Sequence, residues 1–90
     1  MAMTKITDEF LRYMRYEKNR SPLTVKAYHD DLLDFETFFT DRDEALTWQT
    51  VDADIIRDWM EHMMERGNKS ASVNRRLSAV KMLFRFALSR

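Results

Sequence analysis

Apolar side chains recur at steps of three and four residues in four separate stretches of the chain, which is the spacing of one face of an α-helix. The apolar positions of these stretches are Phe10, Leu11 and Met14; Val25, Tyr28, Leu32, Phe35 and Phe39; Ile55, Ile56, Trp59, Met60 and Met63; and Val73, Leu77, Val80, Phe84 and Ala87. The chain has one glycine and one proline, too few for the many turns of an all-β fold. The pattern predicts an all-α domain with four principal helices and short connections.

Residues that cap helices mark the expected boundaries. Thr7 is a suitable N-cap for the first helix. Ser21 can accept a hydrogen bond from the Thr24 amide, and Pro22 then occupies the first helical position of the second helix, which should end within residues 40–43.

The second half of the chain has equally clear boundaries. Asp52 should cap the third helix, and Gly67 should end it in the left-handed conformation. The fourth helix should begin near Ser70 or Ser72. Between the second and third helices, Trp48 is expected to fill the core from an irregular segment.

Composition excludes several classes of protein. The 90 residues are 44% hydrophobic and 33% charged, which suits one small soluble domain spanning residues 1–90. The absence of cysteine rules out disulfides, a thiolate nucleophile and a zinc–cysteine site. No apolar run approaches the roughly 20 residues of a membrane span, and the polar N-terminus does not resemble a signal peptide, so a cytoplasmic protein is expected.

Charge is segregated along the chain although the formal net charge is zero. Residues 66–90 contain seven Lys or Arg and no acid, whereas residues 27–65 contain twelve Asp or Glu against two arginines. The basic segment fits a polyanion partner. Charge alone fits equally well a solvated helix face that neighbouring acidic helices neutralise.

The sequence contains no recognisable catalytic or metal site, and no cofactor is expected. His62 and Glu65 have the helical spacing of a metal-binding pair, but a second such pair is missing. Four acids of the second helix share no helical face, so we expect a solvated surface rather than a paired-carboxylate site. These acids are Asp30, Asp31, Asp34 and Glu36.

Two features favour nucleic acid as a partner. The fourth helix has a polar row beside its apolar one, formed by Asn74, Ser78, Lys81 and Arg85 and widened by Arg75. Such side chains contact phosphates and base edges. The other feature is the start of the second helix, whose free amides suit a phosphate. An ordinary cap beside ordinary surface charge explains the same residues equally well.

Two blocks of sequence resemble the core-binding domain of tyrosine recombinases, the phage-integrase and Xer-type site-specific enzymes. Residues 21–28 read SPLTVKAY, and residues 72–81 read SVNRRLSAVK. The order and the gap between the blocks fit the family, and the resemblance extends from about residue 7 to residue 89. It implies a SAM-like bundle of four to five helices that forms half of a C-shaped clamp on duplex DNA.

The resemblance also implies site residues and partners. The positions that would face DNA are Ser21, Thr24 and Lys26 on the second helix, and Asn74, Arg75, Ser78 and Lys81 on the fourth. The catalytic residues of the family belong to a C-terminal domain that this chain lacks, so Tyr13, Tyr16 and Tyr28 are not the nucleophile. The full-length enzyme is expected to act as a tetramer on DNA.

One alternative comes from a different class of protein. The last turns of the fourth helix are apolar nearly all round because of Met82, Leu83, Phe86 and Leu88. In the recombinase reading this end leads into the interdomain linker. In the alternative reading, the chain is a small helical protein–protein interaction module whose apolar end docks a partner helix.

Overall fold

The computed structural model describes residues 5–89, which form four α-helices and one π-helical turn. The α-helices are α1 (Lys5–Arg12), α2 (Pro22–Arg42), α3 (Ala53–Glu65) and α4 (Ser70–Leu88), and the π-helical turn η1 (Tyr13–Glu17) continues α1. No strand occurs among the described residues, so the prediction of an all-α bundle is confirmed. None of the described helices has the length and apolar character needed to cross a membrane.

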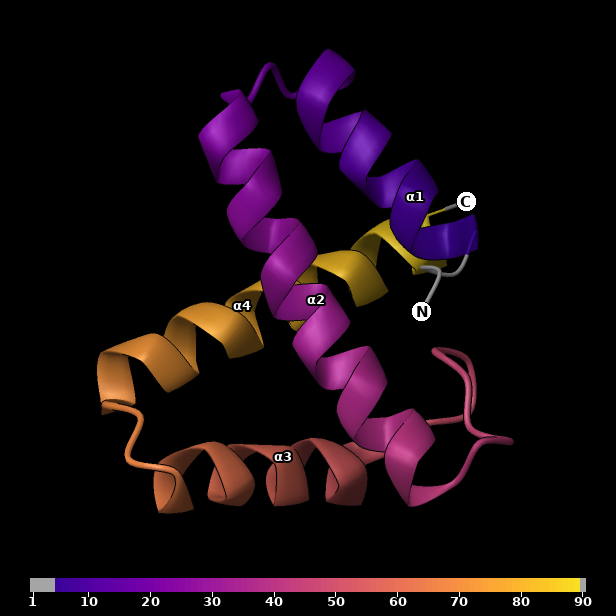
Figure 1. Cartoon of the computed structure of the whole chain (residues 1–90). Coiled ribbons are helices and arrows are strands. Elements are labelled where there is room, and N and C mark those ends of the chain that lie inside the picture. Colours follow the sequence, from indigo (N-terminus) through magenta and orange to yellow (C-terminus); the bar gives the residue numbers. More distant parts are fainter. Residues whose placement is uncertain (1–4, 90) are drawn as a thin grey trace.

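The longest helix, α2, organises the bundle. In Figure 1, α2 runs through the middle of the molecule and α4 crosses it from behind. Helix α3 packs against both, and α1 lies beside the N-terminal half of α2 and also contacts α4. The crossing of α2 and α4 therefore determines where their polar residues lie relative to each other.

A cluster of aromatic rings holds the helices together at the C-terminal half of α2. The Phe35 ring lies 5.2 Å from Phe39, 5.5 Å from Trp48 and 4.7 Å from Trp59, measured between ring centroids. Trp48 comes from the segment between α2 and α3 and is buried, as the sequence predicted. Rings of this size contribute most of the apolar area that such a small core buries.

Five of the expected helix boundaries are confirmed, including the end of α2 at Arg42 and the start of α4 at Ser70. Ser21 Oγ accepts a hydrogen bond from the Thr24 amide at 3.2 Å, with Pro22 as the first residue of α2. Asp52 Oδ1 accepts from the Ile55 amide at 3.0 Å at the start of α3. Gly67 has φ +89° just after α3, a conformation that favours glycine.

The prediction that Thr7 caps the first helix is wrong. Helix α1 already includes Lys5, and Thr7 is fully buried inside it. Thr7 lies three residues before Phe10, so both side chains belong to the buried face of the helix. The acidic residues that follow Thr7 fit a first turn, but packing continues the helix further toward the N-terminus.

Candidate nucleic-acid interface

The predicted polar row forms one exposed strip along α4. Asn74, Ser78, Lys81 and Arg85 are all exposed, whereas Val80, next to Lys81, is fully buried. At 3.6 residues per turn, the four polar positions fall within about 60° of arc around the helix axis. Lys81 and Arg85 form no ion pair with any carboxylate of residues 5–89.

Arg75 lies beside this strip and reaches toward α2. Its Nη2 donates a hydrogen bond to Asp31 Oδ1 at 3.1 Å, across the point where the two helices cross. Arg76 Nε lies 3.6 Å from the same oxygen. The Arg75 side chain is 59% exposed, so one edge of its guanidinium is fixed by Asp31 while the rest faces solvent.

Asp31 is the buried member of this group, with only 4% of its side chain exposed. Burial raises the pKa of the Asp31 carboxyl above its usual value, and the positive charges of Arg75 and Arg76 act in the opposite direction. The two guanidinium groups therefore stabilise the ionised form of the Asp31 carboxyl against the effect of burial.

The prediction that the acids of α2 form a solvated surface is wrong for two of the four. Asp31 and Glu36 are buried, and Glu36 Oε1 accepts from Trp48 Nε1 at 3.2 Å. Asp34 is partly exposed and accepts from Trp59 Nε1 at 3.0 Å. Of the four, only Asp30 is exposed. Asp31 and Glu36 flank the aromatic face of α2, and each accepts from one donor of another segment, Arg75 for Asp31 and Trp48 for Glu36, whereas Glu36 Oε2 has no partner among the described residues.

The start of α2 carries the other predicted residues. Ser21 and Thr24 are joined by two hydrogen bonds, between Ser21 Oγ and the Thr24 amide and between the two hydroxyls at 3.0 Å. Thr24 lies seven residues before Asp31, almost two full turns along the same side of the helix. Thr24 therefore faces the side on which α4 crosses.

Lys26 lies on a different side of α2, about 140° around the helix axis from Asp31. Its ammonium group forms an exposed ion pair with Asp30 at 3.1 Å. A hydrogen bond from His29, together with Lys26, lowers the pKa of the Asp30 carboxyl. The structure thus brings Thr24 to the side of the α4 crossing but does not bring Lys26 there.

Sequence reasoning overlooked two cationic residues. Arg76 is largely buried between Asp31, Asp34 and Met63, where it links three helices. Lys18 lies in the turn before α2, beside Arg20 and near Arg85 of the polar strip. Lys18 belongs to the polar run that ends the first helix, and this run could have identified it as an exposed cation. In the described part of the chain, no group of three or more His, Asp or Glu side chains is arranged to hold a metal ion.

Comparison with known proteins gives a consistent result. The sequence model of a family described as "Phage integrase, N-terminal SAM-like domain" matches residues 7–90. The chain is similar to a protein named tyrosine recombinase XerC from Pelotomaculum thermopropionicum, with 36% identity over 83 residues that cover 88% of this chain and 27% of the relative. It is also similar to tyrosine recombinase XerC from Natranaerobius thermophilus, with 33% identity over 78 residues, which is 87% of this chain and 26% of the relative.

A third relative carries a different name. The chain is similar to tyrosine recombinase XerD from Bradyrhizobium diazoefficiens, with 36% identity over 85 residues that cover 94% of this chain and 26% of the relative. The chain thus spans about a quarter of the length of the curated relatives it matches. No solved structure gives a significant match.

Proposed function

The chain belongs to the family of phage integrase N-terminal SAM-like domains, and from this membership and the geometry above we propose that it binds duplex DNA through α4 and the start of α2. The observation that carries the proposal is the exposed strip of Asn74, Ser78, Lys81 and Arg85, whose two cations no described carboxylate neutralises. Lysine and arginine bind phosphates, and asparagine and serine contact base edges or the backbone.

Arg75 takes part from the edge of this strip. Its guanidinium presents several N–H donors in a rigid plane, and Asp31 engages only one side of that plane. The half-exposed remainder is free to bind a phosphate or a guanine edge while the Asp31 contact fixes its position. Arg75 is therefore an already oriented donor, which costs less entropy on binding than a mobile side chain.

The start of α2 supplies a second contact. Its N-terminal amides and the positive end of the helix dipole attract a phosphate beside Ser21 and Thr24. Lys26 would reach DNA only by leaving Asp30. Exposed ion pairs of this kind contribute about 0–1 kcal/mol, so a phosphate can replace the carboxylate at little cost.

The relatives suggest the larger setting of this domain. They are named tyrosine recombinases and are about four times as long as the segment matched here. We propose that residues 1–90 form the DNA-binding domain of a longer site-specific recombinase. A C-terminal domain would then carry the nucleophilic tyrosine, the enzyme would act as a tetramer on duplex DNA, and the location would be cytoplasmic.

One observation favours the second candidate, a protein–protein interaction module. Leu88 is 88% exposed at the end of α4, beside an apolar hollow of about 550 Å³ that includes Phe84 and Ala87. A partner helix packed there would bury apolar area, and its affinity would respond little to salt. The recombinase reading assigns the same end to contacts with the rest of the enzyme.

A titration with random-sequence duplex DNA at about 50 and 200 mM salt separates the two functions. DNA binding predicts an affinity that falls steeply with salt, and Lys81→Ala should weaken binding severalfold. Each phosphate contact contributes about −0.9 to the slope of the logarithm of the binding constant against the logarithm of the salt concentration. The factor by which affinity falls between the two salt concentrations should therefore be about threefold smaller for Lys81→Ala than for the parent. Arg57→Ala is the charge-matched control, because Arg57 lies on α3 and pairs only with the exposed Asp54.

Two results would contradict the proposal. Absence of DNA binding at the lower salt concentration would favour the interaction module. Equal affinity and salt dependence of the parent and Lys81→Ala would show that DNA binds elsewhere on the domain.

A further inference from the structure

A positively charged hollow lies where the turn before α2 meets the C-terminal half of α4. It has a volume of about 350 Å³, and its charged side chains are Lys18, Arg20 and Arg85. Tyr13, Ser89 and apolar side chains such as Phe10 and Met14 complete its lining, and no carboxylate of residues 5–89 does so. Arg85 is also the last member of the polar strip on α4, so the hollow continues that strip toward the start of α2.

The cations of this hollow have no acidic partner among residues 5–89. The Lys18 ammonium lies 5.9 Å from the centroid of the Tyr13 ring, and Arg20 and Arg85 form no ion pair with a described carboxylate. Three positive charges around one depression repel one another. A bound anion would relieve that repulsion.

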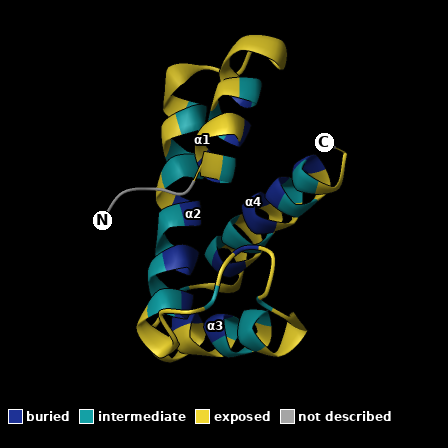
Figure 2. Cartoon of the chain, turned by 90° about the vertical axis from the view of Figure 1, so that its right-hand side faces the viewer, coloured by how far each residue is buried: buried dark blue, intermediate teal, exposed yellow. Residues whose placement is uncertain are grey.

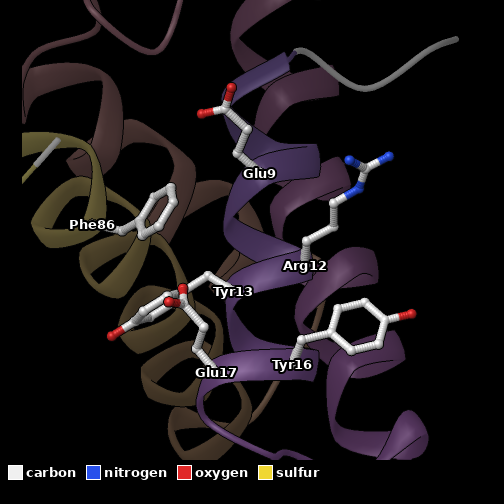
Figure 3. A pocket seen from close by; sticks show the side chains of 6 residues that line it. All are labelled: Glu9, Arg12, Tyr13, Tyr16, Glu17 and Phe86. Carbon is white, nitrogen blue, oxygen red and sulfur yellow. The ribbon is translucent and has the colours of Figure 1, made fainter.

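A neighbouring hollow has a different charge character. It measures about 300 Å³ and shares Tyr13 and Phe86 with the first hollow, but Glu9 and Glu17 also line it (Figure 3). Because two carboxylates face one guanidinium, that of Arg12, this second hollow suits an anion less well than the first.

The turn that carries Lys18 and Arg20 is fixed by its backbone. The Lys18 amide donates to Tyr13 O and the Arg20 amide to Met14 O, both at 3.0 Å, and Asn19 between them has φ +58°. Hydrogen bonds that span five or six residues, together with a left-handed residue, are typical of the C-terminal end of a helix. The whole of residues 15–23 is exposed, which Figure 2 shows as the yellow region at the turn between α1 and α2. The two cations are thus accessible on a turn that backbone hydrogen bonds hold.

We propose that this hollow binds a phosphate group of the DNA backbone next to the phosphates contacted by α4. The inference rests on the proposed function, because duplex DNA supplies the anion. Arg85 would belong to both contacts. Arg20 would connect them to Ser21, so that one row of phosphates follows the surface from α4 to the N-terminus of α2.

The test compares Lys18→Ala, Arg20→Ala and the double variant with the parent and with Arg57→Ala, using a random-sequence duplex of 20 base pairs. Both substitutions leave the backbone hydrogen bonds of the turn intact, and circular dichroism would verify the fold. Each single variant should bind severalfold more weakly at about 50 mM salt. When salt is raised from about 50 to about 200 mM, the affinity of the parent falls by a certain factor. For the double variant this factor should be about tenfold smaller, as expected for two missing phosphate contacts.

The outcomes separate this inference from the proposed function. If Lys81→Ala weakens binding while both turn variants and their combination bind like the parent, the hollow holds no phosphate and the proposed function stands. If the turn variants weaken binding and Arg57→Ala does not, the phosphate subsite is supported. Absence of any DNA binding by the parent overturns the inference and the proposed function together.

Discussion

Arg75→Ala is the most informative substitution at this surface, because it removes a proposed DNA contact and a partner of a buried charge at once. Arg75 Nη2 donates to Asp31 Oδ1, and Asp31 is almost completely buried. Without Arg75, the Asp31 carboxylate keeps only Arg76, whose Nε lies 3.6 Å away. The variant should therefore lose stability as well as affinity for DNA.

The size of the stability loss follows from the exposure of the two partners. Breaking a fully buried ion pair costs about 3–5 kcal/mol, whereas an exposed pair contributes about 0–1 kcal/mol. Asp31 is buried but the Arg75 side chain is 59% exposed, and Arg76 remains, so we expect a loss of about 1–2 kcal/mol. For a domain of this size, that corresponds to a Tm lower by about 5–15 °C.

The loss should depend on pH in a defined direction. The pKa of Asp31 in the folded protein lies above its ordinary value of 3.8, because burial outweighs the arginines. Well above that folded pKa, the carboxylate is ionised and the missing guanidinium costs its full amount. As the pH falls through the raised folded pKa, Asp31 takes up a proton in the folded state first. The difference in Tm between parent and variant should then narrow toward pH 4.

Thermal unfolding followed by circular dichroism measures this effect, and a double-mutant cycle assigns it. Asp31→Asn removes the charge that needs Arg75, so Arg75→Ala should cost about 1 kcal/mol less in that background. Lys81→Ala, which changes an exposed residue without an ion pair to residues 5–89, should change stability by less than about 0.5 kcal/mol. Equal Tm values for Arg75→Ala and the parent at pH 7, or the same cost in both backgrounds, would refute the coupling.

Three further substitutions test the local structure. Ser21→Ala should lower stability by about 1 kcal/mol in thermal unfolding, because the Thr24 amide loses its acceptor; an unchanged Tm would mean that the cap contributes nothing. Gly67→Ala should lower the urea midpoint by an amount equivalent to about 1 kcal/mol, since a Cβ there meets no atom within 4 Å and the cost comes from φ +89° alone. Trp48→Phe should cost about 1–3 kcal/mol beyond the change in packing, because Glu36 Oε1 loses the indole donor; a smaller loss in the Glu36→Leu background, which has no acceptor, would attribute it to that hydrogen bond.

The helices were predictable because their signals are local. An N-cap such as Ser21 or Asp52 and a left-handed Gly67 act within one turn. The apolar spacing predicts the buried face of α2, but on α4 the prediction is partly wrong, because Leu83 and Phe86 are buried whereas Leu77 is not. The prediction for Thr7 failed because the residue types that cap a helix also occur inside helices. Only the packing of Thr7 against the rest of the bundle distinguishes the two positions.

The polar strip on α4 was equally predictable, but its internal partners were not. Asp31 and Arg75 are 44 residues apart in sequence, and their contact depends on how α2 crosses α4. The sequence does indicate the burial of Asp31, because this residue lies three residues after Tyr28 and four before Phe35, on the apolar face of the helix. A carboxylate at such a position implies a buried donor, although the sequence does not identify it.

The zero net charge of the chain is compatible with DNA binding because of where the charges lie. Several carboxylates of α2 and α3 are already paired with Arg75, Arg76, Arg42 or Arg57, whereas Lys81 and Arg85 have no described partner. The described molecule measures 35 × 29 × 24 Å, and the Debye length at physiological salt is about 8 Å. Acids on the far side of α3 are therefore largely screened from a phosphate at α4. At about 0.01 M salt the Debye length grows to about 30 Å, and the same acids would repel DNA. The affinity of this domain should then rise less steeply below about 50 mM salt than the phosphate contacts alone predict, which is the expected behaviour of a charge-segregated surface and not of a uniformly basic one.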